Sequence, residues 1–153
     1  MKTTYIDAIR RIERLHRQCL EAVKDELDRA RVRDLTPVQA MILFNMDDGE
    51  VTVSDLSRRG CYQGSNVSYN VRKLVDLGYL EQHRGEHDRR STYIRRTARG
   101  EEIRALLDGL FAVQADELSE REVALEPMAD GLDHLERFYA GARSMLARRN
   151  AYV

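Results

Sequence analysis

Two short helical segments, joined by a turn between glycines, lie at the centre of this chain and leave few folds open to it. The first is predicted to begin at Thr52, whose hydroxyl forms a capping box with Asp55, and to end at Gly60. The second is predicted over 65–77, with Gly78 in the position that commonly follows a helix. Two short helices with so tight a connection indicate a helix-turn-helix.

The second of these helices has two chemically different faces. At about 100° per residue, Val67, Val71 and Leu74 share one face, which is predicted to meet a core. A merely solvated opposite face would be expected to carry Glu, Lys and Gln, because these are strong helix formers. Ser, Asn and Tyr are poorer choices, so the composition of this face favours binding over solvation. The candidate recognition residues are Ser65, Asn66, Ser68, Tyr69, Arg72 and Lys73.

The segment before this pair predicts two more helices and a very short strand. A long amphipathic helix is predicted over 5–32, with apolar residues at spacings of three and four. At ~1.5 Å per residue it would be about 40 Å long, so part of its apolar stripe is expected to meet a second chain. Another helix is predicted to start at Thr36, where Pro37 and Gln39 complete a capping box, and to end near Met46.

A β-hairpin and further helices are predicted after the central pair. Two strands over 79–84 and 92–95 flank a polar, arginine-bearing segment that is too long for a tight turn, so the tip should project. Thr97 is predicted to cap a helix that a third capping box at 119–122 interrupts. Pro127 is predicted to mark the boundary of the last helix.

Charge is segregated along the chain, although the net charge is only −1. Residues 58–100 carry ten Lys or Arg and four Asp or Glu, which gives +6, and the remainder carries −7. A basic middle between acidic flanks indicates a polyanionic partner. A solvated arginine-rich surface is the alternative that charge alone leaves open.

Composition and the absence of known motifs argue against other classes of protein. Apolar residues make up 42% and charged residues 33%, and no stretch approaches the ~20 apolar residues of a membrane span. The start of the chain lacks an apolar signal segment and only two cysteines occur, so a cytoplasmic protein is expected. No hydrolase elbow, phosphate loop or dinucleotide fingerprint is present, so neither an enzyme nor a cofactor is predicted.

Five short motifs follow one another in a definite order. They occupy residues 55–59, 65–74, 77–80, 88–90 and 97–100. In this order and spacing they resemble the MarR-type family of bacterial transcription regulators. The motifs are similar to the family's first helix-turn-helix element, its recognition helix, the turn into its wing, the wing tip and the Thr-x-x-Gly start of its long dimerisation helix. The chain departs from the family pattern at Arg96, where an apolar residue is common.

The resemblance implies a mainly α fold with a small β-hairpin, a winged helix-turn-helix flanked by dimerisation helices. It implies an N-terminal dimerisation helix over 1–34, a DNA-binding lobe over 35–97 and C-terminal dimerisation helices over 98–153. The implied partners are a second copy of the chain and double-stranded DNA. A two-fold dimer would place its recognition helices about 34 Å apart on a pseudo-palindromic operator.

Each part of the lobe then has an expected role on the DNA. Helix 65–77 would enter the major groove, where Arg72 can reach a guanine or a phosphate. The wing at 85–91 would enter the minor groove through Arg89 and Arg90, with Asp88 holding a guanidinium in place.

Regulation is less constrained by the residues. The resemblance implies a small aromatic or anionic effector between the dimer helices and the DNA-binding lobe. Candidate lining residues are His16, Cys19, Met41 and Phe44, for which ordinary packing is the alternative.

Cysteine and metal chemistry leave further alternatives. Cys61 lies near two arginines and a helix start, which lower a thiol pKa, so a redox-sensing repressor is one alternative. No His/Cys/Asp spacing matches a metal site. A winged-helix module that binds protein is another alternative, but such a helix should expose Leu, Phe or Met. The operator, the regulated genes and the sign of regulation stay open.

Overall fold

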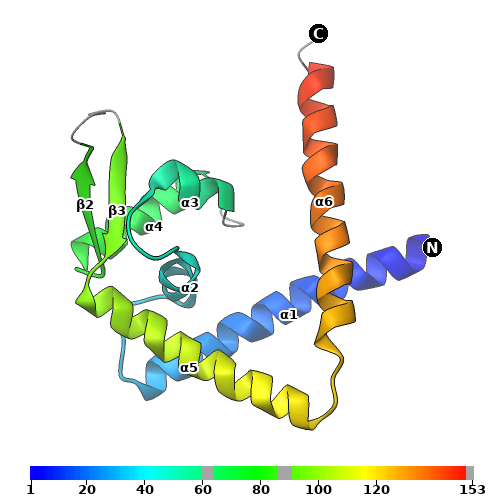
Figure 1. The fold of residues 1–153 in the computed structure, drawn as a ribbon, viewed down its shortest axis with the longest axis horizontal. Coiled ribbons are helices and arrows are strands. Elements are labelled where there is room, and N and C mark those ends of the chain that lie inside the picture. Colours follow the sequence, from blue (N-terminus) through cyan, green and yellow to red (C-terminus); the bar gives the residue numbers. More distant parts are fainter. Residues whose placement is uncertain (60–63, 86–90, 151–153) are drawn as a thin grey trace. The chain divides into compact units, whose positions relative to one another are not determined.

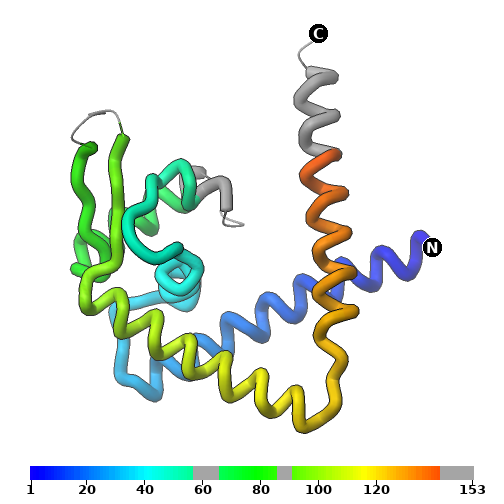
Figure 2. The backbone as a smooth tube through the Cα atoms, viewed as in Figure 1, coloured from blue at the N-terminus to red at the C-terminus, as the bar shows by residue number. Residues whose placement is uncertain are grey.

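The structure, a computed structural model, confirms a mainly helical fold with a small antiparallel sheet (Figure 1). It describes the backbone of residues 1–59, 64–85 and 91–150, and within them the side chains except those of 57–59, 64–65 and 142–150. Figure 2 traces this path and draws in grey the segments whose backbone or side chains are not described. The elements are α1 (Lys2–Arg29), α2 (Pro37–Asn45), β1 (Val51–Thr52), α3 (Val53–Arg59), α4 (Gly64–Asp76), β2 (Leu80–Arg84), β3 (Thr92–Arg96), α5 (Ala98–Glu120) and α6 (Leu125–Asn150).

The chain divides into two compact units. The first spans Met1–Ala112 and contains the sheet, helices α1 to α4 and most of α5. The second spans Val113–Val153 and contains the end of α5 and α6. The division by role proposed above, at residues 34 and 97, is a different kind of boundary and stays a prediction.

Helix α1 begins and ends about one turn earlier than predicted. Beyond its last residue, Arg31 adopts a left-handed conformation with φ 61°. The backbone N–H of Val32 then donates to the carbonyl of Leu27 at 2.9 Å, which satisfies a carbonyl at the helix end. Glycine or asparagine usually takes this conformation, so nothing in the local sequence marked the boundary.

One of the predicted capping boxes is complete, and a second forms the bond from the helix N–H to the capping hydroxyl. At the start of α2 the Gln39 N–H donates to Thr36 Oγ1 at 3.2 Å, and the Thr36 N–H donates to Gln39 Oε1 at 3.0 Å. Before α3 the Asp55 N–H donates to Thr52 Oγ1 at 3.0 Å, and that hydroxyl donates to the Asp55 carboxylate. Both helices therefore start at the position set by local side-chain chemistry.

The third predicted capping box was wrong, although a break does occur there. Ser119 is inside α5, which continues to Glu120. Glu122 has φ 54°, and its N–H donates to the Ser119 carbonyl at 3.0 Å, so these residues end a helix. Helix α6 begins at Leu125, and Pro127 lies in its first turn, where proline removes no intrahelical hydrogen bond.

Gly78 follows α4 and ends it as predicted. It has φ 76°, and its N–H donates to the Val75 carbonyl at 3.0 Å. The Tyr79 N–H donates to the Leu74 carbonyl at 2.9 Å, which completes a Schellman motif. This turn directs the chain from α4 into the sheet.

The predicted hairpin is the main part of a three-stranded antiparallel sheet, with strand order β1-β3-β2. Ile94 pairs with Gln82 on one side and with Val51 on the other. Leu80 and Ile94 are buried on one face of the sheet, whereas Glu81 and Arg95 are exposed on the other. The short strand β1 thus joins the hairpin to the helix-turn-helix.

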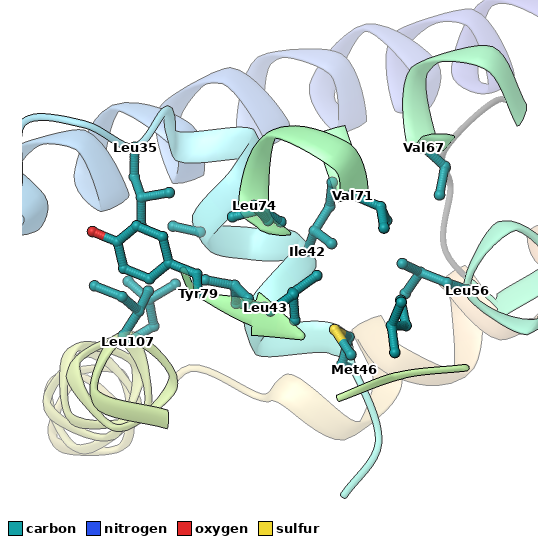
Figure 3. Packing of buried hydrophobic residues seen from close by; sticks show 14 of the residues in the cluster. Leu35, Ile42, Leu43, Met46, Leu56, Val67, Val71, Leu74, Tyr79 and Leu107 are labelled. Carbon is teal, nitrogen blue, oxygen red and sulfur yellow. The ribbon is translucent and has the colours of Figure 1, made fainter. Parts of the chain in front are cut away.

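A single buried cluster holds the first unit together. Figure 3 shows it extending between α2, α4 and the sheet, with Tyr79 at one end and Leu56 and Val67 at the other. The three residues predicted to form the inner face of α4 all belong to it. Its members are Val23, Leu27, Leu35, Ala40, Ile42, Leu43, Met46, Leu56, Val67, Val71, Leu74, Tyr79, Leu80, Ile94, Ile103 and Leu107.

Gly100 explains the Thr-x-x-Gly motif at the start of α5. A Cβ atom at this position would lie 2.3 Å from the carbonyl oxygen of Tyr79. That oxygen cannot easily move, because it accepts a hydrogen bond from the Thr97 N–H at 3.1 Å. The Thr97 hydroxyl also donates to the Gly78 carbonyl at 2.6 Å and accepts from the Gly100 N–H at 3.3 Å.

Replacing Gly100 with alanine is therefore expected to lower the free energy of unfolding by about 1–3 kcal/mol, because the methyl group must displace backbone. Gly109→Ala is the matched control, since a Cβ there has no neighbour within 4 Å and alanine favours the helix by up to about 1 kcal/mol. Denaturant unfolding at one fixed protein concentration measures both variants. Equal effects of the two substitutions would contradict the close approach at Gly100.

Candidate nucleic-acid interface

The outward face of α4 is polar and exposed to solvent. Tyr69 is 59% exposed, while Val67 and Leu74 on the opposite face are fully buried. Among the described residues, Arg72 and Lys73 have no ion-pair partner, so both cations are available to an anion. The predicted recognition residues with described side chains are all exposed, namely Asn66, Ser68, Tyr69, Arg72 and Lys73. Ser65 is within α4, and its side chain is outside the described part.

A hydrogen-bonded glutamine sets the position of α4 against α2. Gln39 is buried, and its Nε2 donates to Asn70 Oδ1 at 3.2 Å. Asn70 Nδ2 in turn donates to the carbonyl of Asn66 at 2.8 Å. The side chain that caps α2 therefore also holds the middle of α4, a link that the sequence analysis missed.

The hairpin stem is described up to Gly85 and from Ser91, and the Gly85 N–H donates to the Ser91 carbonyl at 3.1 Å. The predicted wing-tip residues Asp88, Arg89 and Arg90 lie outside the described residues, and so does Cys61.

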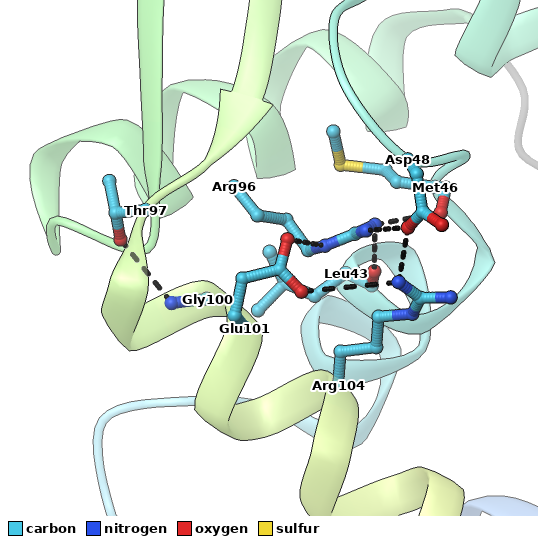
Figure 4. Close-up of polar contacts among 8 residues, drawn as sticks. All are labelled: Leu43, Met46, Asp48, Arg96, Thr97, Gly100, Glu101 and Arg104. Atoms are coloured by element: carbon cyan, nitrogen blue, oxygen red, sulfur yellow. Dashed lines mark hydrogen bonds and ion pairs between the residues drawn. The ribbon is translucent and has the colours of Figure 1, made fainter.

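The Arg96 side chain donates four hydrogen bonds, which are drawn in Figure 4. Its side chain is only 2% exposed. Nη1 donates to the carbonyls of Met46 at 2.7 Å and Leu43 at 3.2 Å, at the end of α2. Nη2 donates to Asp48 at 2.9 Å, and Nε donates to Glu101 at 2.8 Å.

This network joins three elements at the root of the wing. Arg96 is the last residue of β3, Asp48 lies in the loop after α2, and Glu101 is in the first turn of α5. Arg104 extends the network by pairing with Asp48. Arg96, which stands where the resembled family commonly has an apolar residue, is thus a buried cation whose guanidinium donates to four acceptors. The local sequence did not reveal these contacts.

A second polar cluster lies at the other side of the α5 start. Tyr79 is 1% exposed, and its hydroxyl donates to Asp34 Oδ1 at 2.8 Å. The Arg99 guanidinium lies 4.1 Å from the centre of the Tyr79 ring, donates to Asp34 Oδ2 at 2.8 Å and donates to the Leu77 carbonyl at 2.6 Å. The cluster ties the loop between α1 and α2 to the turn after α4.

The pKa values of Tyr79 and Asp34 in this cluster are shifted in opposite directions. Burial, followed by the hydrogen bond to Asp34, raises the pKa of Tyr79 to about 12. Burial also raises the pKa of Asp34, but the hydrogen bonds from Tyr79 and Arg99 outweigh it, so this pKa lies below its ordinary value.

The four predicted effector-site residues occupy different environments. His16 is exposed on α1, and Cys19 is half-buried on the same helix. Met41 and Phe44 are half-buried on α2, and the Phe44 ring packs edge-on against Phe111 at 5.0 Å. Their joint role in binding stays a prediction. Within the described ranges, no group of three or more His, Cys, Asp or Glu side chains is placed to hold a metal ion.

Replacing Arg96 with methionine is expected to lower the free energy of unfolding by about 2–4 kcal/mol, because the carbonyls of Leu43 and Met46 lose a buried donor. Arg95→Met is the matched control, since this neighbour pairs with Glu81 on the exposed face. Its effect should stay within about 0.5 kcal/mol. Thermal or denaturant unfolding distinguishes the two, and a comparable loss in both would argue against the buried network.

The ionisation of Tyr79 predicts a loss of stability in alkali. The folded tyrosine has a pKa of about 12 and an unfolded tyrosine one near 10, so the stabilisation is complete below pH 10 and is lost as pH rises towards 12. The difference in unfolding free energy between wild type and Tyr79→Phe should therefore shrink over this interval. A constant difference from pH 9 to 12 would contradict the assigned shift.

Comparison with known protein families matches residues 35–100 to a winged helix DNA-binding domain. No helix in the described part of the chain has the length and apolar character that crossing a membrane requires.

Among curated proteins, the chain is similar to the exopolysaccharide II synthesis transcriptional activator ExpG of Rhizobium meliloti strain 1021. The two are 35% identical over 100 residues, which is 65% of this chain and 52% of ExpG. The chain therefore spans about half the length of the curated relative that it matches.

Solved structures resemble the chain over most of its length. Streptococcus pneumoniae FabT in complex with DNA has a TM-score of 0.69 at 21% identity, covering 90% of this chain and 99% of FabT. A protein described as a MarR family transcription regulator has a TM-score of 0.72 at 21% identity, covering 94% and 95%. The chain therefore has the fold of these solved structures, as its sequence motifs predicted, and its residues 35–100 match a winged helix DNA-binding domain.

Proposed function

We propose that the chain is a homodimeric, sequence-specific DNA-binding regulator of transcription. The observation that carries this proposal is the exposed polar face of α4, held in place by a buried face and by the Gln39–Asn70 hydrogen bond. The names of the relatives support it, because ExpG is a transcriptional activator and FabT was crystallised with DNA. A transcriptional activator is a regulator and not an enzyme, which agrees with the prediction that the chain is not an enzyme.

On the DNA, α4 would lie in the major groove. Arg72 has the reach and the fork of donors needed for guanine O6 and N7, or for a phosphate. Asn66 and Tyr69 offer further hydrogen bonds, and Ser65 and Ser68 would meet phosphates near the start of the helix. The wing would contribute Arg89 and Arg90 to the minor groove, with Asp88 as their support.

Exposed apolar residues support a dimer. No described side chain of α6 is buried, although the helix spans 26 residues. An isolated helix with an unburied apolar stripe is marginally stable in water, so a partner surface is expected to cover it. The large apolar side chains exposed on α1, α5 and α6 and the turn between the last two are Tyr5, Ile6, Leu15, Val113, Leu118, Val123, Met128, Leu132, Phe138 and Tyr139.

Whether the chain activates or represses transcription stays open. ExpG is described as an activator, so we do not propose that this chain is a repressor. The rival of a protein-binding module has little support, because Tyr69 is the one large apolar side chain exposed among the described residues of α4. A regulator of this kind would act in the cytoplasm.

Selection of bound fragments from genomic DNA by the purified full chain tests the proposal. We expect a pseudo-palindromic site whose half-sites are about one helical turn apart. Arg72→Ala should weaken binding by about 1–3 kcal/mol and relax the preference at one position of each half-site. Arg89→Ala should weaken binding and reduce its dependence on salt, with little effect on folding.

Arg121→Ala is the control, because this exposed arginine lies in the second unit, outside the proposed interface. Its operator affinity should match that of the wild type. If neither interface variant differs from Arg121→Ala, the assignment of α4 and the wing is overturned. A chain that is monomeric at micromolar concentration would overturn the dimer.

A further inference from the structure

One polar residue of α4 is bonded to the protein and not left open to solvent. Asn70 is half-buried, whereas Asn66 and Tyr69 on the same helix are exposed. Its Oδ1 accepts from Gln39 Nε2 at 3.2 Å, and its Nδ2 donates to the Asn66 carbonyl at 2.8 Å. An asparagine that reads adenine uses the oxygen and the nitrogen of its amide together. Because both atoms are already bonded here, Asn70 is suited to holding α4 and not to reading a base.

The amides of Gln39 and Asn70 form a chain whose direction is fixed at both ends. At its start the Thr36 backbone N–H can only donate, so it requires the oxygen of Gln39. At its end the Asn66 carbonyl can only accept, so it requires the nitrogen of Asn70. Gln39 Nε2 and Asn70 Oδ1 are then a matched donor and acceptor. Neither amide can turn over without placing two donors or two acceptors against each other.

Burial makes this chain of hydrogen bonds costly to break. Gln39 is 7% exposed, so its amide cannot replace a lost partner with water. Helix α2 is itself fixed, because Ile42 and Leu43 are fully buried in the core. Gln39 therefore connects a helix that is fixed in the core to the turn of α4 that contains the exposed Asn66.

Apolar packing alone defines the rotation of α4 less narrowly than this chain does. Val67, Val71 and Leu74 pack in the core (Figure 3). Contact between apolar side chains is not directional. A hydrogen bond, in contrast, weakens steeply away from its preferred distance and angle. The bond between Gln39 and Asn70 therefore limits how far α4 can turn or slide against α2.

We propose that Gln39 and Asn70 are positioning residues that determine how well the chain distinguishes its operator from other DNA. Neither residue contacts a base. Together they hold Asn66 and its exposed neighbours where hydrogen bonds to base edges can form. Non-specific binding depends mainly on charge and tolerates a displaced helix, whereas base readout does not. This inference rests on the DNA-binding function proposed above.

The test is the ratio of operator affinity to affinity for unrelated DNA of equal length, measured with the full chain at one salt concentration. Gln39→Met and Asn70→Leu keep the size of each side chain and remove the hydrogen bond between them. We expect each variant to lower the ratio about tenfold, with non-specific affinity within about twofold of the wild type. A variant that was merely less folded would lose both affinities equally. An unchanged ratio in both variants would overturn the proposal.

The double variant Gln39→Met, Asn70→Leu shows whether the two residues act through their mutual bond. If they do, the second substitution removes nothing further, and the ratio should fall by about tenfold, as in either single variant. A fall of about a hundredfold, the product of two independent effects, would refute the joint role.

Thr36→Ala is the matched control for the start of α2. It removes the hydroxyl that caps the helix but leaves the backbone N–H that orients Gln39. We expect it to lower thermal stability without changing the ratio. If it lowered the ratio as much as Gln39→Met does, capping of α2 would account for the effect and the positioning role would be wrong.

Base preference separates a positioning residue from a reading residue. Arg72→Ala should relax the preference at one position of each half-site, whereas Asn70→Leu should relax it at several. Relaxation at a single position in Asn70→Leu would mean that Asn70 reads a base, which contradicts the proposal.

The operator for these measurements is the site that the full chain selects from genomic DNA. A wild type that selects no site would overturn the proposed function and the positioning role with it. A wild type that selects a site, with variants that keep its ratio, would overturn the positioning role alone.

Discussion

A buried guanidinium fixes the root of the wing. The end of α2 presents free carbonyls and the negative end of a helix dipole to the interior, where water cannot solvate them. Arg96 supplies a cation and donors to that point from the last position of β3, and it reaches Asp48 and Glu101 with its remaining N–H groups. The last residue of β3 cannot move away from α2 without breaking several of these bonds, so the described stem of the hairpin has a rigid base.

Helix α4 is held at its middle and at the turn that follows it, by different chemistry. Its middle is bonded through Asn70 to Gln39, and the turn after it is buried at Tyr79. The carbonyl of Tyr79 lies so close to Gly100 that no side chain fits between the turn and α5. The DNA contact proposed for α4 needs such support, because small displacements of its side chains would lose hydrogen bonds to base edges.

The features that sequence predicted correctly are those encoded within a few residues. The capping threonines of α2 and α3, the glycine after α4, the hairpin and the inner face of α4 follow from local spacing. Features that depend on distant contacts were missed. Arg96 meets its α2 acceptors some 50 residues away in the sequence, and the end of α1 depends on an arginine in a glycine-like conformation. Among the site residues, periodicity placed the face of α4, but it could not reveal the buried side chains that hold that face.

The two units differ in how much buried core each contains. The first contains the whole buried cluster, whereas no side chain described in α6 is buried. A helix with its apolar side unburied gains stability only when another surface covers it, so the fold of the second unit and the assembly of the proposed dimer are one equilibrium. The spacing of two recognition helices would then be set by the part of the chain with the least core. In the proposed dimer that part would depend on the second copy, so operator binding would respond to anything that alters the dimer, without any change in the outward face of α4.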